Sequence, residues 1–407
     1  MLRLLLISIL FLSLHAEYVS INIDSNRTKS TIALPYVFSS DSSGLTAGVV
    51  GIMSGYGQKN LTVVATAFTG ELLHVEKHGQ SNTDKAHTQG FFLGMYSYYP
   101  NQQVYIDGSN DSNKEHVFRT QGFNNWLELP ISYTLPWGSS ADEPITVYKL
   151  KNGLVVNRYG YGGGLPFITG STSMEFKPFY NKWSADKLLD EPAWSTNGTK
   201  LTLKHDNTDY ISNPSTGYKF NIEYAHDFGR GNSTQSWNAV TASYSHYINL
   251  ENLSFSRQSQ LAFNVWSSYS PSWDNNNLHP GTTVNAHRPP PWEGASLGGW
   301  DRLRAYDSNR FSDKAAIYYG LEHRIIPTFN PLKKQNWLPI SIDWFQLVTY
   351  VEIGRVAPEY NVKALHTDMK YDVGFSLRAL AASVPVRFEM AYGLEGMSMW
   401  VMVKQPF

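Results

Sequence analysis

The segment KYDVGFSLR, from Lys370 to Arg378, alternates between polar and apolar residues along its whole length. Its charged side chains, Asp372 among them, fall on one face, and the other face carries only Tyr, Val, Phe and Leu. The next segment, VPVRFEMAY at 384–392, repeats the pattern with an Arg and a Glu on its polar face. Successive side chains of a strand point to opposite faces, whereas a helix needs apolar residues three and four apart. The two segments therefore predict neighbouring β-strands with one apolar and one charged face.

Shorter alternating segments recur from residue 34 to the end of the chain, separated by clusters of Gly, Asn, Asp, Ser and Pro. This is the pattern of many strands joined by turns. Further candidate strands are residues 45–54, 61–69, 145–150, 202–205, 218–224, 239–247, 260–266, 316–325 and 347–356. With roughly 10 residues for each strand and similar lengths for turns and loops, residues 34–407 have room for roughly 14 to 18 strands. We expect about 16 strands in one unit, because no linker or low-complexity tract marks a domain boundary.

The composition favours a membrane location for this sheet. Aromatic residues make up 14% of the chain and charged residues only 16%, against roughly a quarter in soluble domains. Strands that face lipid on one side have this bias. After residue 16, no segment is apolar for long enough to be a transmembrane helix. We predict an all-β fold, a transmembrane antiparallel β-barrel. A large secreted β-sandwich enzyme is the alternative, because its composition is similar.

The N-terminus has the features of a secretory signal. Arg3 precedes an apolar run at 4–14, and Ala16 is a small residue in front of a polar segment. This arrangement predicts a signal peptide over residues 1–16, and the apolar run is too short to span a bilayer as a helical anchor. Residues 17–33 then form a short periplasmic segment, too short for a folded domain.

Several kinds of chemistry are not expected. The chain contains no Cys, which excludes disulfides, thiol catalysis and Cys-based zinc sites. Its net charge of −1 gives no reason to expect a nucleic-acid partner. Ser245 and His246 are neighbours that a strand would point to opposite faces, and no GxSxG or HExxH motif accompanies them or His323. His366 and Asp368 are two metal ligands without a third. We therefore expect no enzyme, cofactor or metal site.

The stretch 297–327 reads LGGWDRLRAYDSNRFSDKAAIYYGLEHRIIP. Its distinctive residues are the pair Gly298 and Gly299, the tetrad positions Leu303, Arg304 and Tyr306, the pair Arg310 and Phe311, and finally Glu322. This ordered set resembles the BamA/TamA superfamily of outer-membrane barrels, the bacterial surface antigen type. In that family a Gly pair and a hydrophobic-Arg-Gly-aromatic tetrad lie on a long loop folded into the lumen. Ala305 stands where the family usually has Gly.

The resemblance implies that the loop around Arg304 folds inward. A guanidinium inside a lumen is costly unless carboxylates accept its hydrogen bonds, and the period of two places Glu322, Glu352 and Asp372 on the inward face. We expect Arg304 to pin the loop to Glu322 or Glu352. Asp372 is the third candidate partner. An exposed loop arginine with three unrelated acids is the alternative.

The resemblance extends beyond this loop toward the C-terminus. Residues 350–354, 372–378 and 385–392 resemble the family's later strands, and Phe407 resembles the terminal aromatic by which the assembly machinery recognises outer-membrane barrels. Just before the signature, the segment 273–291 is a non-strand stretch that predicts a long outer loop or a lumen plug. Its Trp273 and the adjoining Trp292 are either packing anchors or interface aromatics.

The family implies assembly or translocation of proteins in the bacterial outer membrane. The expected partners are outer-membrane lipid, the barrel assembly machinery during insertion of this chain, and a periplasmic partner protein. A separate partner is expected because family members carry substrate-capturing POTRA repeats ahead of the barrel, for which residues 17–33 have no room. A passive pore or structural barrel is the alternative function, and an outer-membrane hydrolase is the third.

Overall fold

The computed structural model describes residues 30–40, 44–54, 62–69, 73–81, 88–105, 108–141, 148–157, 162–184, 193–274, 287–331, 342–381 and 384–407. The expected signal peptide lies outside these residues. The first strand begins at Ser30, so it already includes the end of the segment 17–33 that was expected to precede the barrel.

One antiparallel sheet of seventeen strands dominates the fold, which confirms the all-β prediction. The strands are β1 (Ser30–Ser40), β2 (Gly44–Ser54), β3 (Thr62–Thr69), β4 (Leu73–Ser81), β5 (Thr88–Tyr105), β6 (Val117–Glu128), β7 (Ile131–Thr134), β10 (Ser171–Ser184), β11 (Ala193–Asp206), β12 (Gly217–Asp227), β13 (Trp237–Asn249), β14 (Ser256–Tyr269), β17 (Ala315–Pro327), β18 (Ile342–Ala357), β19 (Lys370–Ala381), β20 (Val384–Gly393) and β21 (Gly396–Val403).

β6 and β7 pair with the same neighbours, β5 and β10. They are two halves of one strand interrupted at Pro130, because proline cannot donate to the ladder. Counted this way, sixteen adjacent strands lie within the described residues, in agreement with the expected number.

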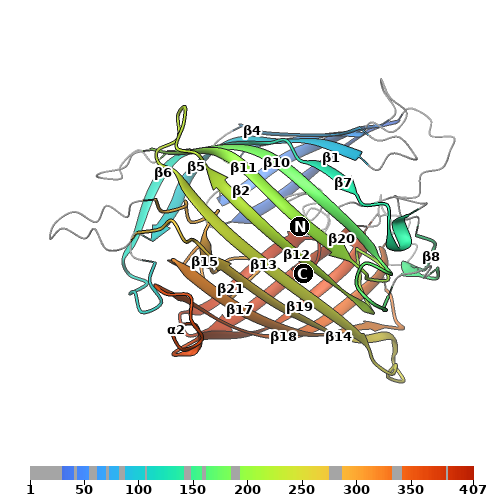
Figure 1. Cartoon of the computed structure of the whole chain (residues 1–407). Coiled ribbons are helices and arrows are strands. Elements are labelled where there is room, and N and C mark those ends of the chain that lie inside the picture. Colours follow the sequence, from blue (N-terminus) through green and yellow to red (C-terminus); the bar gives the residue numbers. More distant parts are fainter. Residues whose placement is uncertain are drawn as a thin grey trace.

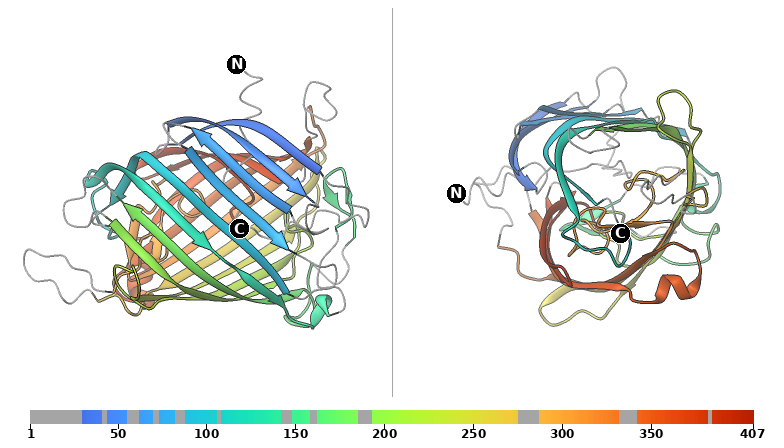
Figure 2. Two further views of the ribbon diagram at one scale, coloured as in Figure 1. Left: turned by 90° about the horizontal axis from the view of Figure 1, so that it is seen from above. Right: turned by 90° about the vertical axis from the view of Figure 1, so that its left-hand side faces the viewer.

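The sheet is a meander that curls into a barrel. Each strand of this sheet pairs with the sheet's next strand along the chain when β6 and β7 are counted as one, and within the described residues no backbone pairing joins β1 to β21. The tilted strands are seen from the side in Figure 1, and Figure 2 shows the ring that they form around an internal loop.

The two faces of the wall differ as the alternation predicts. On β18, Glu352 is fully buried, whereas its neighbours Val351 and Ile353 are 45% and 37% exposed. The same alternation holds on β19, where Asp372 is buried and Val373 is exposed. Charged side chains therefore point into the barrel, and large apolar side chains cover its outer surface.

The two ends of the barrel carry different additions (Figure 1). The loop between β14 and β17 folds inward at one end and contains the hairpin β15 (Ala295–Leu297) and β16 (Phe311–Asp313). The helix α2 (Val362–His366) follows β18 at this end, and its first turn is capped by the side chain of Asn361. At the other end lie the 3-10 helix η1 (Gly138–Ser140) and the hairpin β8 (Leu150–Lys151) and β9 (Leu154–Val155). None of the described helices is long and apolar enough to cross a membrane.

The candidate strands coincide with observed strands except for residues 145–150. Of these six, only Leu150 belongs to a strand, the two-residue β8, and residues 145–147 lie outside the described part of the chain. The prediction was wrong because alternation over so short a stretch does not distinguish a wall strand from a small surface hairpin. Conversely, seven strands of the sheet were not among the candidate segments: β1, β4, β5, β6, β7, β10 and β21. In β5 and β10 the reason is physical, because each contains a proline, and β5 also contains a register shift after Tyr99, which disrupts the period of two.

Candidate functional site

A pair of glycines opens the tip of the internal loop. Gly298 and Gly299 have φ values of 105° and 113°, a region that residues with a Cβ rarely adopt. A Cβ on Gly298 would lie 2.2 Å from the carbonyl oxygen of Asp307. The amide of Gly299 donates to the carbonyl of Tyr306 at 2.9 Å, which closes the tip around residues 300–305. The two glycines thus permit a turn that presents Arg304 to the wall.

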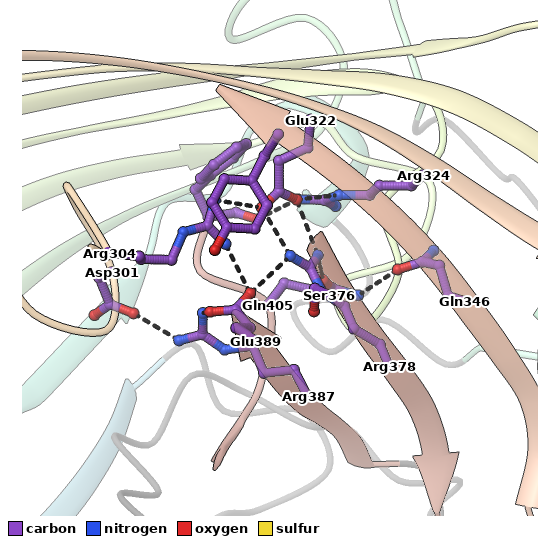
Figure 3. Close-up of polar contacts among 12 residues, drawn as sticks. Asp301, Arg304, Glu322, Arg324, Gln346, Ser376, Arg378, Arg387, Glu389 and Gln405 are labelled. Carbon is purple, nitrogen blue, oxygen red and sulfur yellow. Dashed lines mark hydrogen bonds and ion pairs between the residues drawn. The ribbon is translucent and has the colours of Figure 1, made fainter. Parts of the chain in front are cut away.

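The Arg304 side chain is fully buried and is surrounded by glutamates from three strands (Figure 3). Its Nε lies 3.1 Å from Oε1 of Glu352 on β18, and its Nη1 lies 2.7 Å from Oε1 of Glu389 on β20. Nη2 lies 2.9 Å from Oε1 of Glu322 on β17, as a close ion pair rather than an aligned hydrogen bond. The ring of Tyr350 covers the guanidinium, with its centroid 3.5 Å from Cζ. Every polar edge of the arginine therefore faces a carboxylate.

Three further arginines extend this cluster along the inner wall (Figure 3). Arg378 on β19 bridges two of the glutamates, at 2.7 Å from Glu322 and 3.1 Å from Glu389. Arg324 donates to Glu322 at 2.7 Å, and Arg387 donates to Glu389 at 2.6 Å. Together with the acids that hold the loop, these side chains form what we call the arginine network: Arg304, Arg324, Arg378, Arg387, Glu322, Glu352, Glu389 and Asp372.

The backbone of the loop tip is also hydrogen-bonded to the wall. The Arg304 amide donates to Oε2 of Glu352 at 2.8 Å, and the Ala305 amide donates to Oδ2 of Asp372 at 2.9 Å. The indole of Trp400 on β21 donates to the carbonyl of Arg304 at 2.7 Å. Loop tip and wall are thus joined through main-chain groups on both sides of the arginine.

Electrostatics keep Arg304 ionised. Burial by itself would lower the pKa of its guanidinium, because a charge is poorly solvated in the lumen. The neighbouring carboxylates of Glu352, Glu389 and Glu322 outweigh burial and hold the pKa of Arg304 well above its ordinary value.

A second set of contacts holds the returning half of the loop. Arg310 is fully buried and lies 2.8 Å from Glu395, in the turn between β20 and β21. It also donates to the side chain and the carbonyl of Ser112, at 2.7 Å each. The Tyr105 hydroxyl donates to Asp307 at 2.5 Å. The loop is therefore tied to the β5–β6 connection as well as to the C-terminal strands.

The structure brings most of the predicted site residues together, with one difference in their roles. Glu322 and Glu352 both contact the Arg304 guanidinium, whereas Asp372 accepts from the Ala305 amide instead. Leu303 is fully buried, and the Tyr306 hydroxyl donates to the carbonyl of Tyr371 at 3.0 Å. Leu303, rather than Ala305, takes a positive φ, so the alanine in place of the family's glycine is accommodated without strain.

Sequence reasoning missed Glu389 as a partner of Arg304. The alternation of residues 384–392 had placed Glu389 on the charged face, but spacing along one strand does not reveal which loop residue lies opposite. Arg378 and Arg387 were likewise placed inward without a partner. Only the curvature of the sheet shows that side chains from β17, β18, β19 and β20 converge on one point.

The other candidate residues have local roles in the structure. The side-chain amide of Asn264 donates to the Ser245 hydroxyl inside the barrel at 2.9 Å. His246 lies on the other face, where its Nδ1 forms a hydrogen bond of 3.0 Å with the hydroxyl of the exposed Tyr244. Both ring nitrogens of His366 have partners, the Tyr319 hydroxyl and the Val362 carbonyl. Within the described residues there is no group of three or more potential metal ligands.

Phe407 turns into the barrel. Its side chain is buried beside Tyr247 and Ala262, and its ring centroid lies 5.2 Å from Cζ of Arg324. Pro406 follows the end of β21 at Val403, so its missing N–H costs no ladder hydrogen bond.

A curled antiparallel sheet with an apolar exterior and a loop arginine buried among acids inside it defines the class of membrane β-barrels. A family model, the Omp85 superfamily domain, matches residues 96–398, and the chain belongs to this superfamily. The family identifies it as an outer-membrane protein and confirms the BamA/TamA-type resemblance.

Solved structures of outer-membrane barrels share the fold. BamA from Haemophilus ducreyi lacking POTRA domains 1-3 is 11% identical, with a TM-score of 0.51 over 93% of this chain and 70% of that one. CdiB from Escherichia coli is 11% identical, with a TM-score of 0.57 over 92% of this chain and 61% of that one. CdiB from Acinetobacter baumannii is 12% identical, with a TM-score of 0.50 over 92% of this chain and 59% of that one. This chain thus spans about three fifths of the CdiB chains. A search of curated protein sequences finds no match.

Proposed function

We propose that this protein assembles or translocates other proteins at the outer membrane. The observation that carries the proposal is the buried Arg304, which holds the internal loop against Glu322, Glu352 and Glu389. A buried arginine contacted by three glutamates is expensive to desolvate. Its presence in an Omp85 barrel favours a loop whose position matters for handling a client chain.

The occupied lumen argues against a wide passive pore. Leu303, Arg304 and Phe311 are each at most 1% exposed, so the loop packs against the wall rather than lining a water-filled channel. A client chain that enters the barrel would therefore meet this loop, and passage would require movement of the loop or of the wall.

The proposal includes three partners. The apolar outer face, exemplified by Val351 and Phe375, would contact outer-membrane lipid. A periplasmic partner protein would deliver client chains to the barrel. Phe407 would be read by the assembly machinery while this chain is still unfolded, since it is buried in the folded barrel.

Affinity purification from cross-linked membranes tests this function. We expect the wild-type protein to capture an unfolded barrel client or a periplasmic protein, and Arg304→Ala to capture about tenfold less, equivalent to about 1.4 kcal/mol. Arg230→Ala, which removes an exposed arginine from the β12–β13 turn, is the matched control and should capture as much as wild type. If nothing associates with the wild type and the purified protein conducts ions steadily, the protein is a passive pore and the assembly proposal fails.

A further inference from the structure

The internal loop also reaches the wall opposite the arginine network. Its first arm, residues 287–294, lies against β10 to β13. Glu293 forms a close ion pair with Lys200 on β11, and both side chains are at most 10% exposed. The ring of Trp292 lies 6.3 Å from Trp183 and from Trp194, at the facing ends of β10 and β11. Gln235 donates to the carbonyl of Arg288 at 2.9 Å.

The two anchors of the loop have opposite charges. Glu293 brings a negative charge to a lysine of one wall, and Arg304 brings a positive charge to the acids of the other wall. These residues lie on either side of β15, so the loop crosses the lumen like a strap between β11 and the strands β17 to β20. Widening the lumen would require at least one anchor to release.

We propose that the Lys200–Glu293 contact is the release point of this strap, and that the loop pivots about Arg304 when the lumen opens. The proposal deepens the proposed function by assigning the moving part of its loop. It rests on a difference between what each release would leave behind in the barrel.

Release of Arg304 would leave a buried acid without an arginine, whereas release of Glu293 would leave Lys200 beside another acid. Without Arg304, Glu352 would lose the one arginine that lies within ion-pair distance of it among the described residues. Glu322 and Glu389 would keep their other arginines, Arg324, Arg378 and Arg387. Lys200 instead keeps a second acid, because its Nζ already lies 3.7 Å from Oε1 of Glu128 on β6. Glu128 is also 3.4 Å from Lys177, so this wall retains mixed charges after the arm leaves. Removing one partner of a buried ion pair is costly mainly when the other charge stays unpaired.

Glu293 itself gains by moving into water. Burial raises the pKa of its carboxyl, and the charge of Lys200 only partly opposes this. The acid is therefore held in an unfavourable medium by one principal contact. Arg304 has three acidic partners and two backbone hydrogen bonds around it.

Site-specific thiol labelling tests the pivot, since the chain has no Cys of its own. One reporter is Pro289→Cys on the buried arm, and the other is Ala305→Cys at the tip. Each is combined with Glu293→Gln in the purified folded barrel and treated with a water-soluble maleimide. We expect labelling at position 289 to become about tenfold faster, equivalent to about 1.4 kcal/mol, while labelling at position 305 stays unchanged. Glu251→Gln, at an exposed turn, is the matched control.

The charge-swapped pair Lys200→Glu with Glu293→Lys should restore slow labelling at position 289, which a general loss of packing would not do. Equal acceleration at both positions would show that the loop leaves as one unit, and no acceleration would show that Glu293 does not hold the arm. Either result overturns the release-point proposal. Because no client protein is present, neither result bears on whether the barrel assembles other proteins.

Discussion

Glu389, like Glu322, contacts three arginines of the arginine network. It accepts from Arg304, Arg378 and Arg387, at distances of 2.6 to 3.1 Å, and it is fully buried. Arginine suits such a cluster because its planar group presents five donors in fixed directions and stays charged. A lysine would offer one centre of charge and could not contact three carboxylates in a plane.

We predict that Glu389→Gln destabilises the barrel more than Asp372→Asn. The first change leaves three buried guanidiniums short of one negative charge, and loss of one partner from a buried ion pair costs about 3–5 kcal/mol. The second retains an oxygen that can accept from the Ala305 amide, so it should cost about 1 kcal/mol. Urea unfolding of the barrel in lipid vesicles, followed by its electrophoretic shift, gives both values. Equal costs would show that the acids are not organised as the structure indicates.

Gly298 is the second residue whose identity is set by local geometry. Gly298→Ala should displace the loop tip, because its φ is positive and the new Cβ would collide with the Asp307 carbonyl. We expect a loss of about 1–3 kcal/mol in stability and faster proteolysis within residues 298–310. Ala305→Gly is the control, since that backbone is not in the positive region, and it should leave proteolysis nearly unchanged. A Gly298→Ala protein as resistant as wild type would contradict this explanation.

At the scale of elements, the internal loop acts as a part separate from the strands that hold it. Its hairpin β15–β16 pairs only with itself among the described strands, while side chains and amides join it to the wall. The amide of Ser312 on β16 donates to the carbonyl of Gly108 at 2.7 Å, next to the end of β5. This close approach allows the loop to be fixed covalently.

We predict that Gly108→Cys with Ser312→Cys forms a disulfide that blocks function reversibly. An ideal Cβ at position 108 lies 3.1 Å from Cβ of Ser312 and 2.9 Å from its amide nitrogen, whereas the usual Cβ separation in a disulfide is about 3.5–4.5 Å. The backbone at Ser312 must therefore shift to admit the new side chain, and the cysteine-free chain offers no competing thiol. Client capture by the double variant should fall on oxidation and return with dithiothreitol, while capture by each single variant should not change on oxidation. Full activity of the oxidised pair would mean that the loop does not need to move.

At the scale of the whole molecule, neighbouring residues of a strand lie in two different chemical environments, one outside the barrel and one inside it. Large apolar side chains lie on the outer surface and buried charges lie within, because each strand has a side-chain period of two. This inside-out arrangement suits a wall between lipid and a packed lumen, and the superfamily match places the protein in an outer membrane.

We predict that Val351→Arg destabilises the barrel in lipid bilayers by about 2–4 kcal/mol, because it would place a charge on the lipid face. Val362→Arg is the matched control. Val362 is also exposed but lies on α2, beyond the end of β18, where water can solvate the charge. Its cost should be within about 0.5 kcal/mol. Unfolding titrations in vesicles measure both, and a similar small effect of the two changes would place β18 outside the bilayer.

The sequence by itself was sufficient for the strand pattern, the inward face of Asp372 and Glu389, and the nature of the loop around Arg304. These depend on local periodicity and on a motif of neighbouring residues. It was not sufficient to single out every strand of the sheet, for example β5 and β10, whose prolines break the alternation, and β4 and β6, which were also missed. It also mistook the brief β8 for a longer strand.

Only the tertiary structure decided which charges meet. Glu389 contacts Arg304 across 85 positions and Lys200 contacts Glu293 across 93, because the sheet curls and the loop crosses its interior. A side-chain period specifies the direction in which each group points from its own strand. The distance between two such groups depends on the curvature of the wall and the path of the loop, which no single segment encodes.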